Sequence, residues 1–210
     1  SFPEFRNLPL VWFSLFLEIL LLSLIKPIVQ NFEIVSWIAV FLHAVLVLLI
    51  LAKIPLRIKL IFMGAFLARL MFLFWDIYAQ HIFILPNSGA DTEFYYEWAV
   101  RVSENISYLN EKIRGGVYSK ILGIVFYFTG PMRLLGQYLN VLLGLWVVII
   151  IYKILQILEI NDRTVKIILF IAAFFPNSLI MSAIMLREIA PAFLVIWSFY
   201  FFIKWYKWSY

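Results

Sequence analysis

Residues 34–52 read IVSWIAVFLHAVLVLLILA, a run of 19 residues with no charged side chain, and Lys53 follows it directly. A helix needs about 20 apolar residues to cross the roughly 30 Å hydrocarbon core of a bilayer. The run therefore predicts a membrane-spanning helix. Five other apolar runs, bounded by charged or turn residues, raise the expected number of spans to about six: 8–28, 60–85, 134–158, 165–186 and 189–203.

The composition of the whole chain agrees with this prediction. Of the 210 residues, 65% are hydrophobic and 14% are charged, whereas globular domains are roughly 45–50% apolar and about 25% charged. The 17 basic and 12 acidic side chains are too few to form a polar shell around this apolar content. The sequence thus excludes a soluble enzyme, a disordered tail and a fibrous repeat, and it predicts an all-α polytopic membrane protein with a single transmembrane domain.

Cysteine, histidine and net charge restrict the chemistry further. The chain has no cysteine, which excludes disulfides, thiolate nucleophiles and thiolate metal sites. Because it has only two histidines, a zinc site is also disfavoured. The net charge of +5 is spread along the chain rather than gathered in a stripe. We therefore expect no nucleic-acid partner and interpret the charge as a signal of membrane orientation.

The longest polar stretch, residues 86–116, precedes a short apolar segment, residues 117–129. Thirteen helical residues at 1.5 Å each reach only about 20 Å, too little to cross a bilayer. Gly115-Gly116 and Gly130-Pro131 bracket the segment. We expect it to lie along the membrane surface, so that residues 86–131 form one loop with interfacial helices.

Basic residues gather near the ends of the predicted spans. If residues 117–129 do not cross, the positive-inside rule places three basic clusters on one side, the cytoplasm, together with both termini. Residues 86–131 and the corner at 186–191 then face outside. The clusters are Lys53, Arg57 and Lys59; Lys153, Arg163 and Lys166; and Lys204 and Lys207.

The outer loop contains the densest polar and aromatic passage, NSGADTEFYYEWA at residues 87–99. Asp91 could act as a general base or hold a divalent cation beside a lipid-linked substrate. The alternative is that Asp91 caps a helix beginning at Thr92, with Glu93 near the positive end of the helix dipole. Both roles are compatible with one residue.

Aromatic residues in the same passage recur at helical spacing. Phe94, Tyr95 and Trp98 would share one apolar face, as expected of an interfacial helix with aromatic rings at headgroup depth. We favour an anchor over a sugar-stacking platform, and the second use stays open.

Three charged residues near the outer ends of later spans are candidate substrate ligands. Arg187 could bind a phosphate through two hydrogen bonds, and Glu188 could order the loop or a metal. Arg133 lies at the mouth of the fourth span. The alternatives are a simple corner, with Pro191 in the first turn of the last span, and an Arg133 side chain that reaches to the interface.

Glu18, His43 and Arg69 lie near the middle of the first three predicted spans. Charges at this depth are costly and are usually paired. We expect Glu18 and Arg69 to neutralise each other with His43 nearby. The same three residues could instead form the proton path of a transporter.

The order of three segments points to a known superfamily: GADTEFYYEWA at 89–99, GPMRLLGQYLNVLLGLWVVIIIYKILQILEI at 130–160 and FFPNSLIMSAIMLREIAPAFLVIW at 174–197. Over about residues 60–204, the chain resembles the GT-C integral-membrane glycosyltransferases, which include the protein O-mannosyltransferases and aminoarabinose transferases. It is most similar to their bacterial members of unassigned substrate. The resemblance implies a bacterial cytoplasmic-membrane enzyme that takes a sugar from a polyprenyl-phosphate donor on the outer face and transfers it with inversion.

The resemblance also implies roles for individual residues. Asp91 matches the acidic residue of the first outer loop, which serves catalysis or binds a metal, and Arg133 matches the arginine that opens the next span. The Arg187-Glu188 corner is similar to the family's second charged corner, and Glu93 is a further catalytic candidate. Because family members are longer, a further membrane segment or subunit is expected to complete the site. The alternatives are a small transporter and a non-catalytic subunit of a larger complex.

Overall fold

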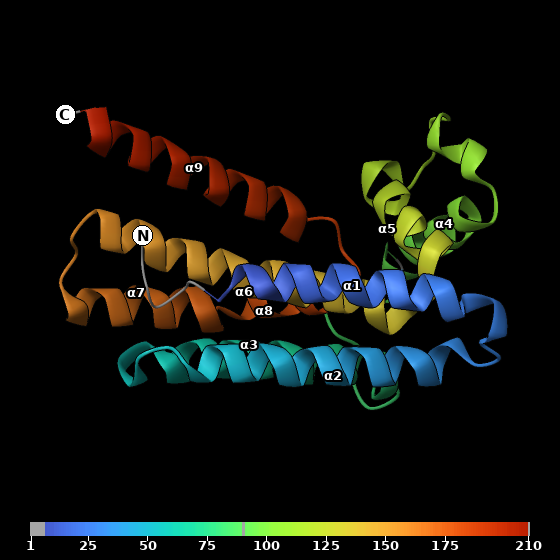
Figure 1. The fold of residues 1–210 in the computed structure, drawn as a ribbon, viewed down its shortest axis with the longest axis horizontal. Helices are drawn as coiled ribbons and strands as arrows, with labels where there is room; N and C mark the ends of the chain where they lie inside the picture. The colour runs from blue at the N-terminus through green and yellow to red at the C-terminus, as the bar shows by residue number, and fades with distance from the viewer. Residues whose placement is uncertain (1–6, 90, 210) are drawn as a thin grey trace. The chain divides into compact units, whose positions relative to one another are not determined.

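All regular structure within residues 7–89 and 91–209, which the computed structural model describes, is helical, and this confirms the predicted all-α class (Figure 1). Residues 1–6 and 210, parts of the termini predicted to be cytoplasmic, lie outside this description. Within the described residues, two short 3-10 segments, η2 (Lys26–Ile28) and η3 (Ile106–Leu109), accompany nine α-helices. These are α1 (Pro9–Ile25), α2 (Phe32–Ala52), α3 (Leu56–Tyr78), α4 (Asp91–Glu104), α5 (Gly116–Thr129), α6 (Arg133–Ile157), α7 (Asp162–Phe174), α8 (Pro176–Ala183) and α9 (Ile189–Ser209).

Five helical segments of the described chain are long and apolar enough to cross a membrane. They are α1 with η2, α2, α3, α6 and α9. Helices α7 and α8 make a sixth candidate if the pair, bent by 48°, counts as one span. Helix α5 has 14 residues and is apolar but short, as the sequence predicts for this segment. The chain is thus a polytopic integral membrane protein with five or six candidate spans.

Two predicted spans differ most from the observed helices, while the span predicted over 189–203 continues as α9 to Ser209. Helix α3 ends at Tyr78 rather than at Leu85, because the chain folds back and the Trp75 Nε1 atom donates a hydrogen bond of 2.9 Å to the Phe83 carbonyl. The run 165–186 is broken at Phe175, whose backbone is extended. Proline lacks the N–H that would continue the helix, so Pro176 starts a new helix instead.

The contacts divide the chain into two compact units. Unit 1 comprises residues 1–55 and 86–138, and unit 2 comprises residues 56–85 and 139–210. Helix α6 therefore begins in unit 1 and continues into unit 2.

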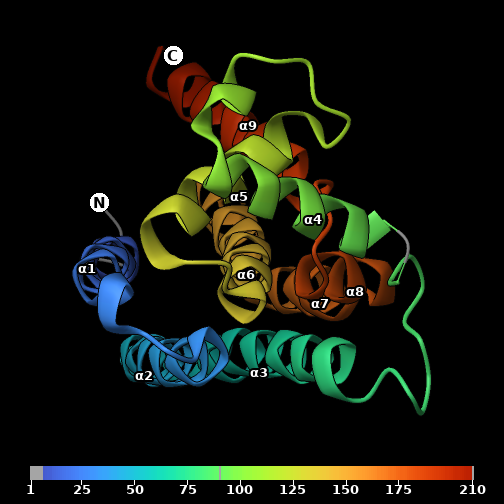
Figure 2. The same ribbon diagram turned by 90° about the vertical axis from the view of Figure 1, so that its right-hand side faces the viewer.

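In unit 1, α1 runs beside α2, and α5 packs against both α1 and α4 (Figure 2). The buried residues of α2 recur every three or four positions, as expected of a helix that buries one face. Gly123 allows the close packing of α4 and α5, because a Cβ atom added there would lie 2.5 Å from the Val102 Cβ atom and 3.0 Å from the Ala99 carbonyl oxygen. The α4–α5 hairpin positions the polar loop.

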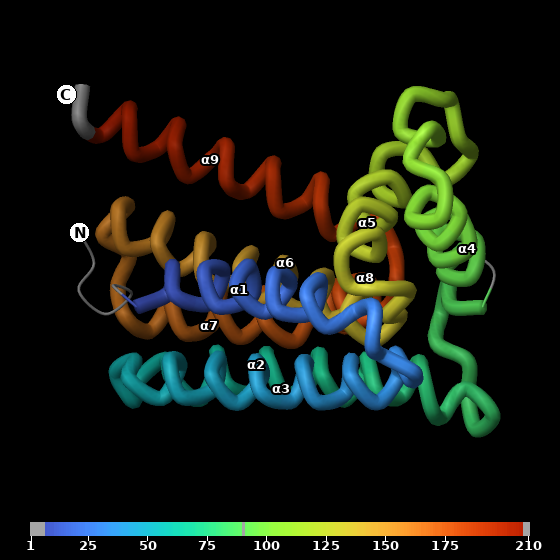
Figure 3. Tube along the Cα trace, turned by 45° about the vertical axis from the view of Figure 1, so that its right-hand side comes forward, coloured from blue at the N-terminus to red at the C-terminus, as the bar shows by residue number. Residues whose placement is uncertain are grey.

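In unit 2, α3 packs against α7 and α8 (Figure 3). Helix α9 follows α8 after the corner formed by residues 184–188. The Phe62 ring of α3 meets the Tyr152 ring of α6 edge to face, with ring centroids 5.9 Å apart. Near the other end of α9, the Lys207 Nζ atom forms an ion pair with the Glu159 Oε1 atom at 2.5 Å. This pair connects the end of α9 to the corner between α6 and α7.

We expect the Glu159–Lys207 pair to make stability depend on acid. The hydrogen bond and charge of Lys207 lower the pKa of Glu159 below its ordinary value. The stabilisation is therefore complete above the ordinary carboxyl pKa and is lost as the pH falls through the lowered pKa of the folded protein. Thermal unfolding followed between neutral and acidic pH should show a small loss that Glu159→Gln abolishes, because both side chains are exposed enough for solvent to screen the pair. An unchanged acid profile in this variant would contradict the assignment.

Candidate functional site

The predicted site residues Glu93 and Arg133 form an ion pair within unit 1. The Arg133 Nη1 atom lies 2.6 Å from the Glu93 Oε1 atom, and the two side chains are 24% and 40% exposed respectively. Glu93 comes from the first turn of α4, and Arg133 is the first residue of α6. The pair therefore brings a carboxylate and a guanidinium together at a partly exposed position.

Tyr96 supports this pair from one turn further along α4. The Arg133 Cζ atom lies 5.9 Å from the centre of the Tyr96 ring, and the Tyr96 hydroxyl donates a hydrogen bond of 3.3 Å to the Pro131 carbonyl. Burial raises the pKa of the Tyr96 hydroxyl above its ordinary value. The positive charge of Arg133 lowers this pKa in part, and the negative charge of Glu93 raises it. The Tyr96 hydroxyl thus remains a hydrogen-bond donor, and its bond to the Pro131 carbonyl fixes the backbone just before α6.

Asp91 is the first residue of α4 and is exposed. The sequence alternative in which Asp91 precedes the helix as its cap differs from this placement by one residue. The loop before α4 turns through Asn87 and Gly89, which have φ of 66° and 92°, and the Gly89 N–H donates to the Thr92 Oγ1 atom at 3.0 Å. Asp91 and Glu93 therefore both stand in the first turn, where the helix dipole favours carboxylates.

The aromatic residues of α4 pack within unit 1. Tyr95 is 8% exposed, and its ring meets the Tyr118 ring of α5 edge to face at 5.4 Å. Trp98 contacts Phe94 and Tyr108, with ring centroids 6.4 Å and 6.2 Å apart. These rings contribute to the packing around α4, so Tyr95 in particular offers little surface for sugar stacking.

The second charged corner, Arg187 and Glu188, lies between α8 and α9 in unit 2. The Arg187 Nε atom is 3.7 Å from the Glu188 Oε1 atom, and the side chains are 61% and 43% exposed. The backbone of this corner is held by Asn140 of α6, whose Nδ2 atom donates to the Ile184 and Leu186 carbonyls at 2.8 Å and 2.9 Å. Asn140 thus orders a corner that carries an exposed guanidinium.

Sequence reasoning missed Asn140 and its neighbour Gln137, which are both buried in α6. Their signal was present, because two amides three residues apart interrupt an otherwise apolar run. Polar residues inside a span are costly and tend to face protein groups rather than lipid. The Asn140 contacts follow this rule.

Arg69 of α3 is fully buried in unit 2. Its Nη1 atom donates to the Ala65 and Ala173 carbonyls, each at 3.0 Å, and its Nη2 atom lies 3.4 Å from the Ser178 Oγ atom. These partners join α3 to both sides of the break between α7 and α8. The predicted pairing with Glu18, which belongs to unit 1, stays a prediction.

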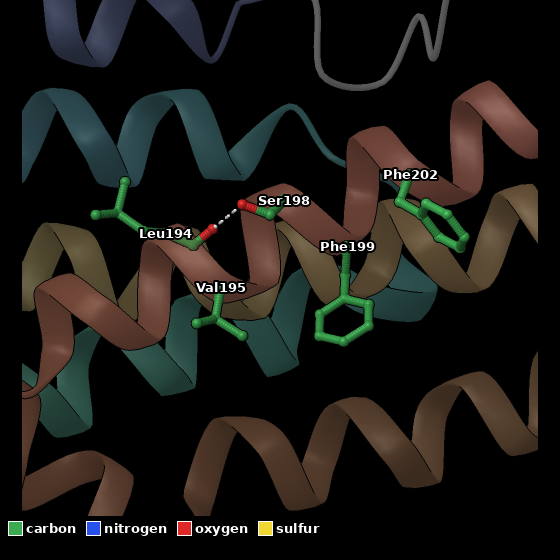
Figure 4. A pocket seen from close by; sticks show the side chains of 5 residues that line it. All are labelled: Leu194, Val195, Ser198, Phe199 and Phe202. Atoms are coloured by element: carbon green, nitrogen blue, oxygen red, sulfur yellow. Dashed lines mark hydrogen bonds between the residues drawn. The ribbon is translucent and has the colours of Figure 1, made fainter.

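The parts of the chain that the structure describes contain no group of three His, Asp or Glu side chains that could hold a metal ion. Asp91 and Glu93 bring two carboxylates to the start of α4. A separate groove of about 460 Å³ runs along α9 (Figure 4). Among the described residues that line it, only Ser198 has a polar side chain, and this hydroxyl donates a hydrogen bond to the Leu194 carbonyl. The others are apolar: Leu194, Val195, Phe199 and Phe202.

Comparisons with protein-family models, curated proteins and solved structures give no match.

Proposed function

We propose that this membrane protein is a GT-C-like glycosyltransferase that uses a polyprenyl-phosphate-linked sugar as donor. The observation that supports the proposal is the ion pair between Glu93 and Arg133. It places a partly exposed guanidinium beside the first turn of α4, where Asp91 is exposed. A phosphate ligand and a general base are the two requirements of this reaction.

Arg133 is the proposed phosphate ligand. A guanidinium matches two phosphate oxygens with parallel hydrogen bonds, and Glu93 keeps the Arg133 side chain oriented before the donor arrives. A phosphate that approaches Arg133 would be repelled by Glu93. We therefore expect Arg133 to exchange part of its contact with Glu93 for the donor.

Asp91 is the proposed general base. In the transfer, the acceptor hydroxyl oxygen attacks the anomeric carbon, its proton passes to Asp91, and the bond from the anomeric carbon to the phosphate oxygen breaks. The polyprenyl phosphate departs with the bonding electrons. Arg133 would offset the charge that develops on this leaving group.

The same proposal assigns the orientation of the chain. The loop 86–131 and the corner 186–191 would face the outside of a bacterial cytoplasmic membrane, where lipid-linked donors present their sugars. The basic span ends would face the cytoplasm.

We expect Arg133→Gln to weaken binding of polyprenyl phosphate at least tenfold, because the variant loses the charged phosphate ligand. Intact-protein mass spectra of the full chain with bound lipid would measure this, using the corresponding polyprenol as a ligand that lacks the phosphate. Polyprenol binding should not change. Asp91→Asn should bind the phosphate normally but fail to transfer a sugar.

Arg101→Gln is the matched control, because Arg101 belongs to α4, the helix that carries Glu93, and like Arg133 it lies over an aromatic ring, that of Trp98 at 5.1 Å. This control should bind polyprenyl phosphate like the parent chain. If Arg133→Gln also binds it normally, the phosphate site is not at Arg133 and the transporter or accessory-subunit alternative gains support.

A further inference from the structure

A cavity of about 260 Å³ opens beside α1 and α2 in unit 1. Both helices are candidate spans, so the cavity belongs to the membrane-spanning part of the chain. Its lining residues recur at three- and four-residue spacing on each helix, which places them on one face of each. They are Ser14, Leu17, Glu18 and Leu21 of α1 and Leu42, His43 and Leu46 of α2.

His43 already has partners for both ring nitrogens. Its Nε2 atom lies 3.0 Å from the Val11 carbonyl, which can only accept, so the geometry assigns the proton to Nε2. Its Nδ1 atom can then accept the hydrogen bond of the Tyr138 hydroxyl at 2.8 Å. The Ser14 hydroxyl also donates to Val11, at 2.9 Å. The polar groups of Ser14 and His43 therefore already have hydrogen-bond partners within the protein.

Glu18 is the one acidic residue among the described residues of the lining. It lies at the middle of α1, and its Oε2 atom is buried and accepts no hydrogen bond from residues 7–89 or 91–209. The part of the chain that the structure describes places no lysine or arginine in the lining. A carboxylate in apolar surroundings without a compensating partner is costly, and a bound positive charge would provide that partner.

We propose that this cavity binds a lipophilic cation, such as a quaternary ammonium or phosphonium ion with apolar substituents, with Glu18 as its counter-ion. Leucines supply the walls for the substituents, and the volume is close to the lower end of small-molecule sites, roughly 300 Å³. A cation without N–H groups suits a site whose other polar groups are already hydrogen-bonded.

The route of entry agrees with this ligand class. Leu17, Leu21 and Leu42 are 43%, 63% and 60% exposed, so the cavity opens towards the surface that faces lipid. A cation with apolar substituents can enter a bilayer, whereas a strongly hydrated ion cannot. The site is distinct from the proposed phosphate site, because its described lining includes Glu18 but no arginine that could bind a phosphate.

The test compares tetraphenylphosphonium with tetraphenylborate, two ions of the same shape and opposite charge. Equilibrium dialysis of the full chain in nanodiscs, corrected for uptake by empty nanodiscs, measures the binding of each. We expect at least tenfold tighter binding of the cation than of the anion. Glu18→Gln should remove this preference, and Glu18→Asp, which keeps the charge, should retain part of it.

Glu97→Gln is the matched control, because Glu97 is an exposed acid of α4 in the same unit. It should bind both ions like the parent chain. Thermal unfolding of every variant checks that each one folds. Equal binding of the two ions to the parent chain, or a charge preference that survives in a folded Glu18→Gln variant, would overturn the proposal.

Discussion

Replacing Arg69 with methionine is expected to lower the free energy of unfolding by about 3 kcal/mol, since a hydrogen bond to a charged group contributes roughly 1.5–3 kcal/mol. Methionine has a similar length but no donor. The Ala173 carbonyl, which accepts from Arg69 at 3.0 Å, belongs to the last turn of α7, where carbonyls lack intrahelical partners. The variant would leave this carbonyl buried without its donor. Unfolding by sodium dodecyl sulfate in mixed micelles, followed by tryptophan fluorescence, would measure the loss.

Two further variants distinguish the loss of the hydrogen bond to the Ala173 carbonyl from a general effect of removing a charge. Arg69→Lys keeps the charge but has a shorter donor group, so an intermediate loss is expected. Arg101→Met removes an exposed arginine of α4 and should change stability by less than about 0.5 kcal/mol. Replacing a buried charged group with an apolar one can also stabilise a protein. A gain in stability for Arg69→Met would therefore show that the Ala173 carbonyl does not depend on the guanidinium.

Gly123→Ala is expected to lower the free energy of unfolding by about 2 kcal/mol, although alanine favours a helix over glycine by about 1 kcal/mol. The reason is the Val102 Cβ atom, only 2.5 Å from the position of the new methyl group. A Cβ atom moves only with its backbone, so α4 and α5 would have to separate. The same unfolding assay would measure the effect, together with proteolysis of the loop between the two helices.

The matched control for this prediction is Gly64→Ala in α3. Its added methyl group would meet the far edge of the Phe174 ring at 3.0 Å, and a ring edge can shift. We expect this variant to be close to neutral, because helix propensity and mild crowding oppose each other. If Gly123→Ala is as stable as Gly64→Ala, the α4–α5 hairpin is not packed as closely as described.

The long charge-free runs predict the fold class well, because a bilayer requires a fixed length of apolar helix. They predict the ends of helices less well. The run 60–85 is apolar to Leu85, yet α3 ends at Tyr78, since hydropathy does not report that the chain folds back. The break at Pro176 was visible as a residue but not as a bend, because prolines also occur within spans.

The candidate site was predictable as residue types but not as an arrangement. Asp91, Glu93 and Arg133 are recognisable as charges next to apolar segments. The ion pair between Glu93 and Arg133 joins positions 40 residues apart, and it depends on the packing of α4, α5 and the start of α6. Neither periodicity nor charge pattern contains this information, and the engagement of His43 by Tyr138 was hidden for the same reason.

The bend between α7 and α8 determines the thickness of the bilayer hydrocarbon core that this helix pair can span. As one straight helix, their 21 residues would reach about 32 Å at 1.5 Å each. With the 48° bend, the reach along the α7 axis falls to about 28 Å, close to the roughly 27 Å of a thin bilayer. The pair would then cross such a membrane upright, whereas a thicker bilayer would have to thin locally around it.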